Sequence, residues 1–374
     1  MRSDRRIFFT PGPLTLSPNV LSAMQDDWGS RDPSFIELTG ALLSGLKRLF
    51  SADDEYVLIP LQGSGTYAVE AMIGSIIPPT GKLLVFDNGS YADRMGQIAA
   101  AIRRPYCIVK SSYIEPLNIQ KLREILAQDR SITHVGMVHL ETVSGLLNPI
   151  SEISNVVNEA GCKLLIDAMS SFGAFDLDVN TLYCDAIAFS SNKCLQGPPG
   201  LGFVLARESA LVAGLSPSLA LDLNLQLQYF KHQAQWRFTP PTHVVAATYA
   251  ALRELQNEGG IAKRLARYSD NFSVIYSACT SELGLTPLLR DSFLSPIILA
   301  LKSPQDPMFS FDELYQYLKA QNLYIYPGNI TGSNTFRIGC IGDIDRTDMS
   351  NLAVAMVDYW RKAGVNAQRS LTAG

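Results

Sequence analysis

One lysine stands where a buried strand is expected to end. Lys193 follows the apolar run Ala186–Ser190 and precedes a Gly- and Pro-rich loop at Gly197–Gly200. A surface residue of an unusual loop is the ordinary explanation. A desolvated lysine has a lowered pKa, however, so its neutral amine can attack a carbonyl carbon and form a Schiff base. The position makes Lys193 a candidate for covalent chemistry, which the lysine alone does not establish.

A carboxylate closes another apolar run, 26 positions before the lysine. Asp167 ends Leu164–Asp167, and a turn residue or helix N-cap is one explanation for it. Ligands of open α/β sheets bind at the carboxyl edge of the strands, which gives the second explanation. A buried carboxylate at that edge can keep the nitrogen of a pyridine ring protonated, and the ring then withdraws electrons.

A third candidate is the segment Gln62–Thr66, between an expected strand and an expected helix. It fits neither the Walker A pattern nor the G-x-G-x-x-G pattern, so neither a P-loop nor a dinucleotide fingerprint is indicated. Its glycines let the backbone approach an anion, and the helix that follows offers free N–H groups. Ser64 and Thr66 add hydroxyl donors on either side of Gly65. A tight turn without a ligand is the alternative.

The three features together match the needs of an enzyme that uses pyridoxal 5′-phosphate (PLP). Such an enzyme requires an amine for the aldehyde, an acid for the ring nitrogen and a cup for the phosphate. The four histidines lack metal-ligand spacing, so we expect no metal site.

Short apolar runs alternate with amphipathic stretches between residues 55 and 206. The expected strands are Tyr56–Leu61, Lys82–Asp87, His134–His139, Lys163–Asp167, Ala186–Ser190 and Gly202–Ala206. They are not strictly alternating, which is typical of strands buried on both faces of a mainly parallel sheet. This pattern predicts an α/β fold with right-handed crossovers.

The pattern changes after about residue 215. We predict a helix at His243–Asn257, then strands and helices of a smaller α+β unit, including strands at Ser295–Leu301 and Thr335–Gly339. The expected boundaries are 15–255 for the large domain and 256–374 for the small one, with residues 1–14 packing near the latter.

Composition excludes several classes of protein. Lys and Arg number 31 and Asp and Glu 35, a net charge of −4, which argues against a nucleic-acid binder. No apolar stretch reaches the roughly 18 residues of a membrane span. The six cysteines are scattered singly, which indicates free thiols in a reducing compartment. We expect a cytoplasmic protein.

Longer segments resemble the class V aminotransferases of PLP fold-type I. The similar segments are Thr10–Thr15, Leu61–Ala71, Asp167–Gly173, the Lys193 loop, Trp236–His243 and Phe336–Gly342. The resemblance implies a large domain with a mainly parallel sheet flanked by helices, and a smaller C-terminal α+β domain. It is greatest to members that move the amino group of 2-aminoethylphosphonate to pyruvate, giving phosphonoacetaldehyde and alanine.

The resemblance also implies roles for residues around the cofactor. Lys193 would bind PLP covalently and move the proton, and Asp167 would pair with the ring nitrogen. Ser64, Gly65 and Thr66 would hold the phosphate.

Further roles follow from the same resemblance. Tyr91 would stack on the ring, and Thr142 would lie near the phenolic oxygen. Thr239 would reach the phosphate from a neighbouring subunit, which implies a homodimer. Arg337 would bind the acid group of the substrate with its planar fork. For Arg94 we expect a structural ion pair rather than a substrate contact.

Three positions depart from the pattern of the family. Ala92 stands where glycine is usual, Arg31 replaces a tryptophan, and Asn329 replaces a lysine. A cation gained and a cation lost near the expected substrate pocket leave the substrate open, and Arg31 becomes our candidate for the extra charge of a phosphonate. Another amino donor is therefore an alternative: a related aminophosphonate, or alanine or serine with glyoxylate. A non-catalytic binding protein and a nicotinamide oxidoreductase are further alternatives, and the missing fingerprint argues against the latter.

Overall fold

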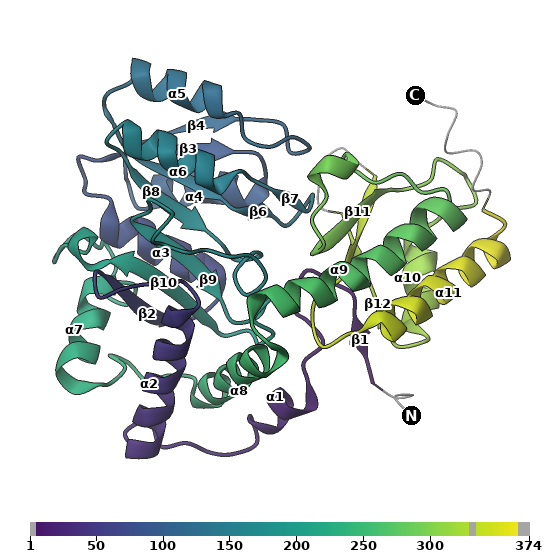
Figure 1. Ribbon diagram of the computed structural model, residues 1–374, viewed down its shortest axis with the longest axis horizontal. Helices are drawn as coiled ribbons and strands as arrows, with labels where there is room; N and C mark the ends of the chain where they lie inside the picture. The colour runs from purple at the N-terminus through teal and green to yellow at the C-terminus, as the bar shows by residue number, and fades with distance from the viewer. Residues whose placement is uncertain (1–4, 329–333, 366–374) are drawn as a thin grey trace.

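The computed structural model describes residues 5–328 and 334–365 (Figure 1). A seven-stranded sheet has the strand order β2, β10, β9, β8, β5, β3, β4. The strand bounds are β2 Tyr56–Gln62, β3 Lys82–Asp87, β4 Tyr106–Lys110, β5 Ile132–Val138, β8 Lys163–Asp167, β9 Ala186–Ser190 and β10 Leu201–Arg207. All neighbours from β9 to β4 are parallel, and β10 is antiparallel to both β9 and β2. The mainly parallel α/β sheet predicted from the sequence is confirmed.

Helices cover both faces of this sheet. The bounds on one face are α2 Pro33–Arg48, α5 Ile119–Gln128, α6 Ile150–Glu159 and α8 Thr242–Glu258, and on the other α3 Gly65–Ile76, α4 Ser90–Ala101 and α7 Leu223–Gln233. Successive residues of a strand pack on the two faces in turn: Leu84 and Phe86 on the first face, Leu83 and Val85 on the second. Because the inner strands are buried on both sides, their sequences are continuous apolar runs rather than alternating ones.

A second, smaller group of elements includes a three-stranded antiparallel sheet. Its strands are β11 Ile298–Lys302, β14 Thr335–Gly339 and β13 Tyr326–Pro327, in that order. The helices α9 Ile261–Ser277, α10 Phe311–Lys319 and α11 Arg346–Ala363 contribute to the same core. In Figure 1, α9 runs from the large sheet to this group.

The N-terminal strand belongs spatially to the C-terminal group. Strand β1, Ile7–Phe8, pairs in parallel with β12, Leu323–Tyr324, and Phe9 is fully buried in the same core. The short helix α1, Pro18–Ser22, then leads back to the large sheet, where it contacts α8. Residues 9–17 therefore cross from one group to the other. The proposed domain boundary near residue 255 stays a prediction.

Local sequence signals explain where several helices start and stop. The side chain of Asn118 accepts the backbone N–H of Lys121 at the start of α5, and Asp345 caps α11 in the same way. Helix α8 ends at Gly259, whose φ of 103° suits glycine. None of the described helices is long and apolar enough to cross a bilayer.

Candidate active site

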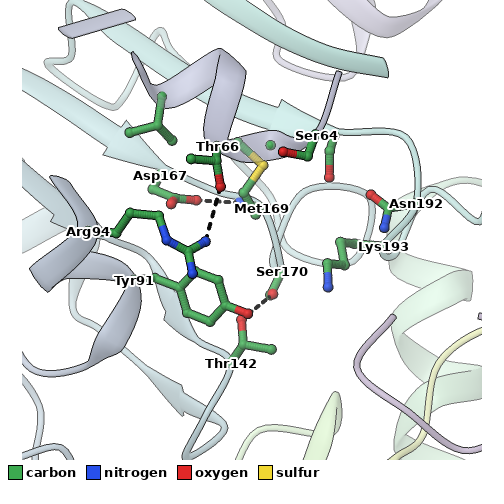
Figure 2. A pocket seen from close by; sticks show the side chains of 13 residues that line it. Ser64, Thr66, Tyr91, Arg94, Thr142, Asp167, Met169, Ser170, Asn192 and Lys193 are labelled. Carbon is green, nitrogen blue, oxygen red and sulfur yellow. Dashed lines mark hydrogen bonds between the residues drawn. The ribbon is translucent and has the colours of Figure 1, made fainter. Parts of the chain in front are cut away.

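The carboxyl ends of the parallel strands open on one pocket (Figure 2). It lies beyond the ends of β8 and β9 and beside the start of α3, and its volume is about 640 Å³ with the open mouth included. This volume is in the range of small-molecule sites. Seven residues predicted from the sequence line the pocket: Ser64, Gly65, Thr66, Tyr91, Thr142, Asp167 and Lys193.

Lys193 enters the pocket from the turn after β9. Its Nζ atom donates a hydrogen bond to the carbonyl oxygen of Pro11 at 2.6 Å, so the N-terminal segment lies against the amine. Burial is the main reason that the pKa of Lys193 is lowered to about 8, and the positive charge of Arg337 acts in the same direction. A larger share of this amine is therefore neutral near pH 8 than for a surface lysine, which suits a nucleophile and a base.

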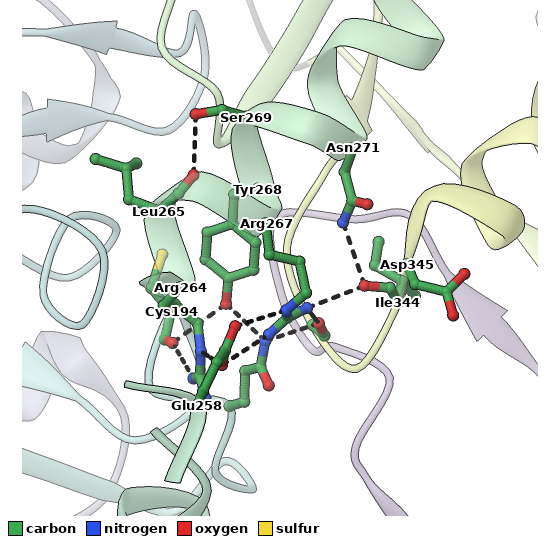
Figure 3. A network of polar contacts seen from close by, with 12 residues as sticks. Cys194, Glu258, Arg264, Leu265, Arg267, Tyr268, Ser269, Asn271, Ile344 and Asp345 are labelled. Carbon is green, nitrogen blue, oxygen red and sulfur yellow. Dashed lines mark hydrogen bonds and ion pairs between the residues drawn. The ribbon is translucent and has the colours of Figure 1, made fainter. Parts of the chain in front are cut away.

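Polar side chains fix the turn that carries the lysine (Figure 3). The carbonyl oxygen of Cys194 accepts a hydrogen bond from Nη1 of Arg264 at 2.9 Å. Arg264 also pairs with Glu258 at 2.6 Å, and the other carboxylate oxygen of Glu258 pairs with Arg267 at 2.8 Å. Arg267 donates to the carbonyl of Gly342 at 2.8 Å. The network thus ties the lysine turn to the segment that follows β14.

Asp167 is the last residue of β8 and is 4% exposed. The backbone N–H of Met169 donates to its Oδ1 at 2.9 Å. Burial raises the pKa of Asp167 to about 6, while the cations Arg94 and Lys193 oppose that rise. With this pKa the carboxylate is mostly charged at pH 7, and because it is buried, a protonated ring nitrogen would stabilise it.

The start of α3 forms an anion cup. Ser64 is the N-cap residue, but its side chain makes no capping hydrogen bond, so its hydroxyl is free to face a ligand. A Cβ atom on Gly65 would lie 2.4 Å from Sδ of Met169, so any other residue there would have to displace that side chain. Gly63 has a φ of 128°, which also favours glycine. Free N–H groups and the positive end of the helix suit a phosphate.

Tyr91 lies in the first turn of α4 and Thr142 in a loop, and a buried carboxyl links these two segments of the pocket wall. Glu141 is fully buried and accepts hydrogen bonds from the backbone N–H groups of Val143, at 3.0 Å, and Tyr91, at 3.4 Å. Burial raises the pKa of Glu141 to about 7. The hydroxyls of Thr142 and Ser170 are 2.6 Å apart. These contacts set the positions of Tyr91 and Thr142 relative to Asp167.

Arg337 lies on β14 of the smaller sheet; it does not itself line the pocket, but it contacts the pocket residue Thr142. It is 9% exposed, and it donates to the carbonyl oxygens of Pro327 at 3.2 Å and Thr142 at 3.4 Å. Burial lowers its pKa. No carboxylate of the described residues forms an ion pair with Arg337. A nearly buried guanidinium with only carbonyl partners has its positive charge available for an acid group.

Some predicted residues do not line the pocket. Arg31 and Thr239 are exposed, on the segment before α2 and the segment before α8. Asn329 lies outside the described residues. Ala92 is fully buried in α4, where it packs in the apolar layer rather than facing the pocket. Neither Arg31 nor Thr239 therefore lines this pocket within one chain.

Sequence reasoning missed several residues of the site. Asn192, Met169 and Ser170 line the pocket, and each adjoins or closely follows a predicted residue. Proximity to Lys193 and Asp167 in the chain is the signal that could have found them. Glu141 directly precedes Thr142 in the chain, yet nothing in the sequence distinguishes its buried carboxyl from a surface one.

The arrangement combines an amine of lowered pKa, a buried carboxylate and an anion cup in one pocket. It suits an aldehyde-bearing ring that carries a phosphate, since each part of such a ligand finds a chemically matched group. Within the described ranges no group of three or more His, Cys, Asp or Glu side chains is suited to a metal ion.

A family model and a comparison with individual proteins identify the same family. The sequence model described as "Aminotransferase class-V" matches residues 39–277. A protein of Pseudomonas fluorescens called 2-aminoethylphosphonate–pyruvate transaminase is 43% identical over 361 residues, covering 96% of this chain and 98% of the relative.

Solved structures share the fold at lower identity. Pyridoxamine–pyruvate aminotransferase from Mesorhizobium loti superposes with a TM-score of 0.85 at 24% identity, covering 99% of this chain and 97% of that one. Ureidoglycine–glyoxylate aminotransferase from Bacillus subtilis gives 0.87 at 21% identity, with coverages of 98% and 96%. These likenesses confirm the aminotransferase fold that the sequence predicts.

Proposed function

Because the chain belongs to the class V aminotransferases, we propose that it transfers the amino group of 2-aminoethylphosphonate to pyruvate. The products would be phosphonoacetaldehyde and alanine, formed in two half-reactions at one site. Relatives named for this reaction are 40–43% identical over nearly the whole chain, which supports the choice of substrates. The observation that carries the proposal is the single pocket that Lys193, Asp167 and the cup at Ser64–Thr66 share.

The cofactor is PLP, and the residues present fit it. When bound, PLP withdraws electrons from the carbon that carries the amino group. The cup at Ser64–Thr66 would hold its phosphate, and Asp167 would hold a proton on its ring nitrogen. Tyr91 would fix the plane of the ring by stacking, a contact worth about 1 kcal/mol beyond burial. Thr142 would face the phenolic oxygen.

Lys193 would serve as both covalent anchor and proton carrier. With a pKa of about 8, its amine releases and takes up a proton near neutral pH. In the first half-reaction Nζ would remove the proton from the donor carbon that bears nitrogen. In the second half-reaction it would return a proton to the carbon of pyruvate that becomes the alanine Cα.

Arg337 would bind the acid group of each substrate in turn. Its fork suits both the carboxylate of pyruvate and the phosphonate of the donor, and no carboxylate of the described residues competes for it. A phosphonate carries more negative charge than a carboxylate, and Arg31 of a second copy is our candidate for the additional contact. Arg31→Ala should then lower kcat/KM for the aminophosphonate by a larger factor than for pyruvate. A decrease by the same factor for both substrates would remove this assignment.

A homodimer would complete the site, with Thr239 of the partner subunit at the phosphate. Thr239 is exposed, and large apolar side chains near it or near the cup are exposed as well: Tyr67 (52%), Leu219 (70%) and Phe238 (46%). Tyr67 directly follows the cup residue Thr66. A second subunit packed here would therefore cover apolar surface and close the pocket.

Mixing two inactive variants tests this arrangement. A Lys193→Ala subunit combined with a Thr239→Asp subunit has one native site if Thr239 acts across the interface. About a quarter of native activity per subunit is then expected for a random mixture of otherwise inactive dimers. No recovery in hybrid dimers would show that Thr239 acts within its own subunit or not at all.

A donor-by-acceptor matrix on the purified protein tests the proposed reaction. The donors are 2-aminoethylphosphonate, a longer aminophosphonate, alanine and serine, each paired with pyruvate and glyoxylate. We expect the highest kcat/KM for 2-aminoethylphosphonate with pyruvate and no turnover in Lys193→Ala. A tenfold preference for another pair would reassign the substrate, and bound PLP without turnover of any pair would favour a binding protein.

All six cysteines are free thiols. We therefore also propose a reducing, cytoplasmic compartment, where thiols stay unpaired.

A further inference from the structure

Arg94 lines the pocket, and the ion pair expected for it from the sequence is absent from the described part of the chain. It lies on α4, one turn after Tyr91, so the two side chains share a face of the helix. A partly buried guanidinium without a carboxylate partner requires another explanation.

Two contacts give Arg94 its position (Figure 2). Its Nη1 donates to Oγ1 of Thr66 at 3.1 Å, and its Cζ lies 4.9 Å from the centre of the Tyr91 ring. The second distance is within the range of cation–π attraction. One side chain therefore links the anion cup on α3 to the aromatic ring on α4.

The hydrogen bond orients the hydroxyl of Thr66. A threonine hydroxyl has one donor hydrogen, and its oxygen accepts the N–H of Arg94. The hydroxyl hydrogen is thereby left for another acceptor, and Thr66 lies in the cup that suits a phosphate. The guanidinium also restrains rotation of the Tyr91 ring, because a tilted ring would lose the cation–π contact.

Arg94 also acts on Asp167 through its charge. Arg94 and Lys193 both favour the ionised form of this carboxyl, whereas burial favours the neutral form. Glu141 interacts with Asp167 as a like charge, and Tyr91 lies close enough to interact with both carboxyls. Covalent binding of Lys193 to an aldehyde would replace its ammonium group, whereas it would leave the guanidinium of Arg94 unchanged.

We propose that Arg94 is a positioning residue for PLP, which holds the Tyr91 ring and the Thr66 hydroxyl in place and keeps a positive charge beside Asp167. This role is independent of the amino donor, so it stands or falls separately from the proposed substrates. It predicts that removing the guanidinium weakens cofactor binding and moves the acid side of the pH profile of that binding to higher pH.

The test is titration of the PLP-free Arg94→Met and Arg94→Lys proteins with PLP, in which the absorbance of the bound cofactor reports binding. We expect the Kd to rise about ten- to hundredfold in Arg94→Met, since it loses both the cation–π contact and the hydrogen bond. Arg94→Lys keeps a charge but not the planar fork, so its Kd should fall between those of Arg94→Met and the native protein. Gln97→Met, one turn further on the same helix, is the matched control and should bind as the native protein does.

The pH dependence separates positioning from general damage to the fold. Without a cation at position 94 the pKa of Asp167 rises, so the acid side of the binding profile should move to higher pH in Arg94→Met and stay in Arg94→Lys. The same comparison in a Glu141→Gln background excludes titration of Glu141 as the cause. The proposal is overturned if Arg94→Met binds PLP within twofold of the native Kd, or if its acid limb does not move.

Discussion

Replacing Gly12 by alanine should disable the lysine without unfolding the protein. Gly12 has a φ of 122°, and a Cβ atom there would lie 2.7 Å from Nζ of Lys193, against ordinary contact at 3.4 Å or more. The amine must therefore move by about 0.7 Å. The nearest obstructing atom is the end of a flexible side chain, and the backbone oxygen of Asn192, at 3.2 Å, must give by only a few tenths of an ångström. Displacement of a reacting group by about 1 Å, by contrast, can cost roughly a hundredfold in rate.

The matched control is Gly161→Ala. Gly161 also has a positive φ, of 70°, but a Cβ atom there meets no other atom within 4 Å. Gly161→Ala should lose about 1–2 kcal/mol of unfolding free energy from backbone strain. Gly12→Ala should lose more, because a φ of 122° lies outside the left-handed region that other residues adopt. Only Gly12→Ala should lose activity, about 10- to 100-fold in kcat/KM for 2-aminoethylphosphonate and pyruvate. Native activity in Gly12→Ala, or equal losses in the two variants, would refute the reasoning.

Three further substitutions test other parts of the site. Burial raises the pKa of Asp167 to about 6, so ionisation of this carboxyl lowers the stability of the folded protein as the pH rises from about 4 to 6. Asp167→Asn should therefore remove activity yet stabilise the PLP-free protein above pH 6, by up to about 3 kcal/mol in chemical denaturation. Unchanged stability would contradict the raised pKa. Glu258→Gln leaves Arg264 buried without its partner and should lower the free energy of unfolding by about 3–5 kcal/mol. Glu159→Gln removes an exposed ion pair and should lower it by less than about 1 kcal/mol. Similar losses for the two variants in thermal denaturation would contradict this difference. Arg337→Lys keeps the charge but loses the fork, so KM should rise about tenfold or more for both substrates, and an unchanged KM for either would remove Arg337 from its binding.

The buried strands were predictable because a parallel sheet is apolar on both faces. Lys82–Asp87 and Lys163–Asp167 were predicted with their observed bounds, and Tyr56–Leu61 is one residue short of β2. The edge strand β4, Tyr106–Lys110, was missed because its residues are partly or fully exposed, so its sequence lacks a long apolar run. The antiparallel direction of β10 was not predictable, since a central strand has the same composition in either direction.

The site could be predicted where chemistry and position in the chain coincide. Asp167 and Lys193 end or closely follow strands, and strand ends meet at one edge, so their approach follows from topology. Arg94 was misjudged because its partners are a ring and a hydroxyl rather than a carboxylate, and these contacts depend on how α3 and α4 pack. Thr239 and Arg31 stay predictions, because neither lines the pocket within one chain.

The central claim is that Lys193 forms the covalent bond to the cofactor aldehyde. Sodium borohydride reduces such a bond to a stable amine, so peptide mass mapping of the reduced, PLP-loaded protein locates it. We expect the added mass on the peptide that contains Lys193, at about one cofactor per chain, and none in Lys193→Ala. Modification of a different lysine, or retention of the label in Lys193→Ala, would contradict the account.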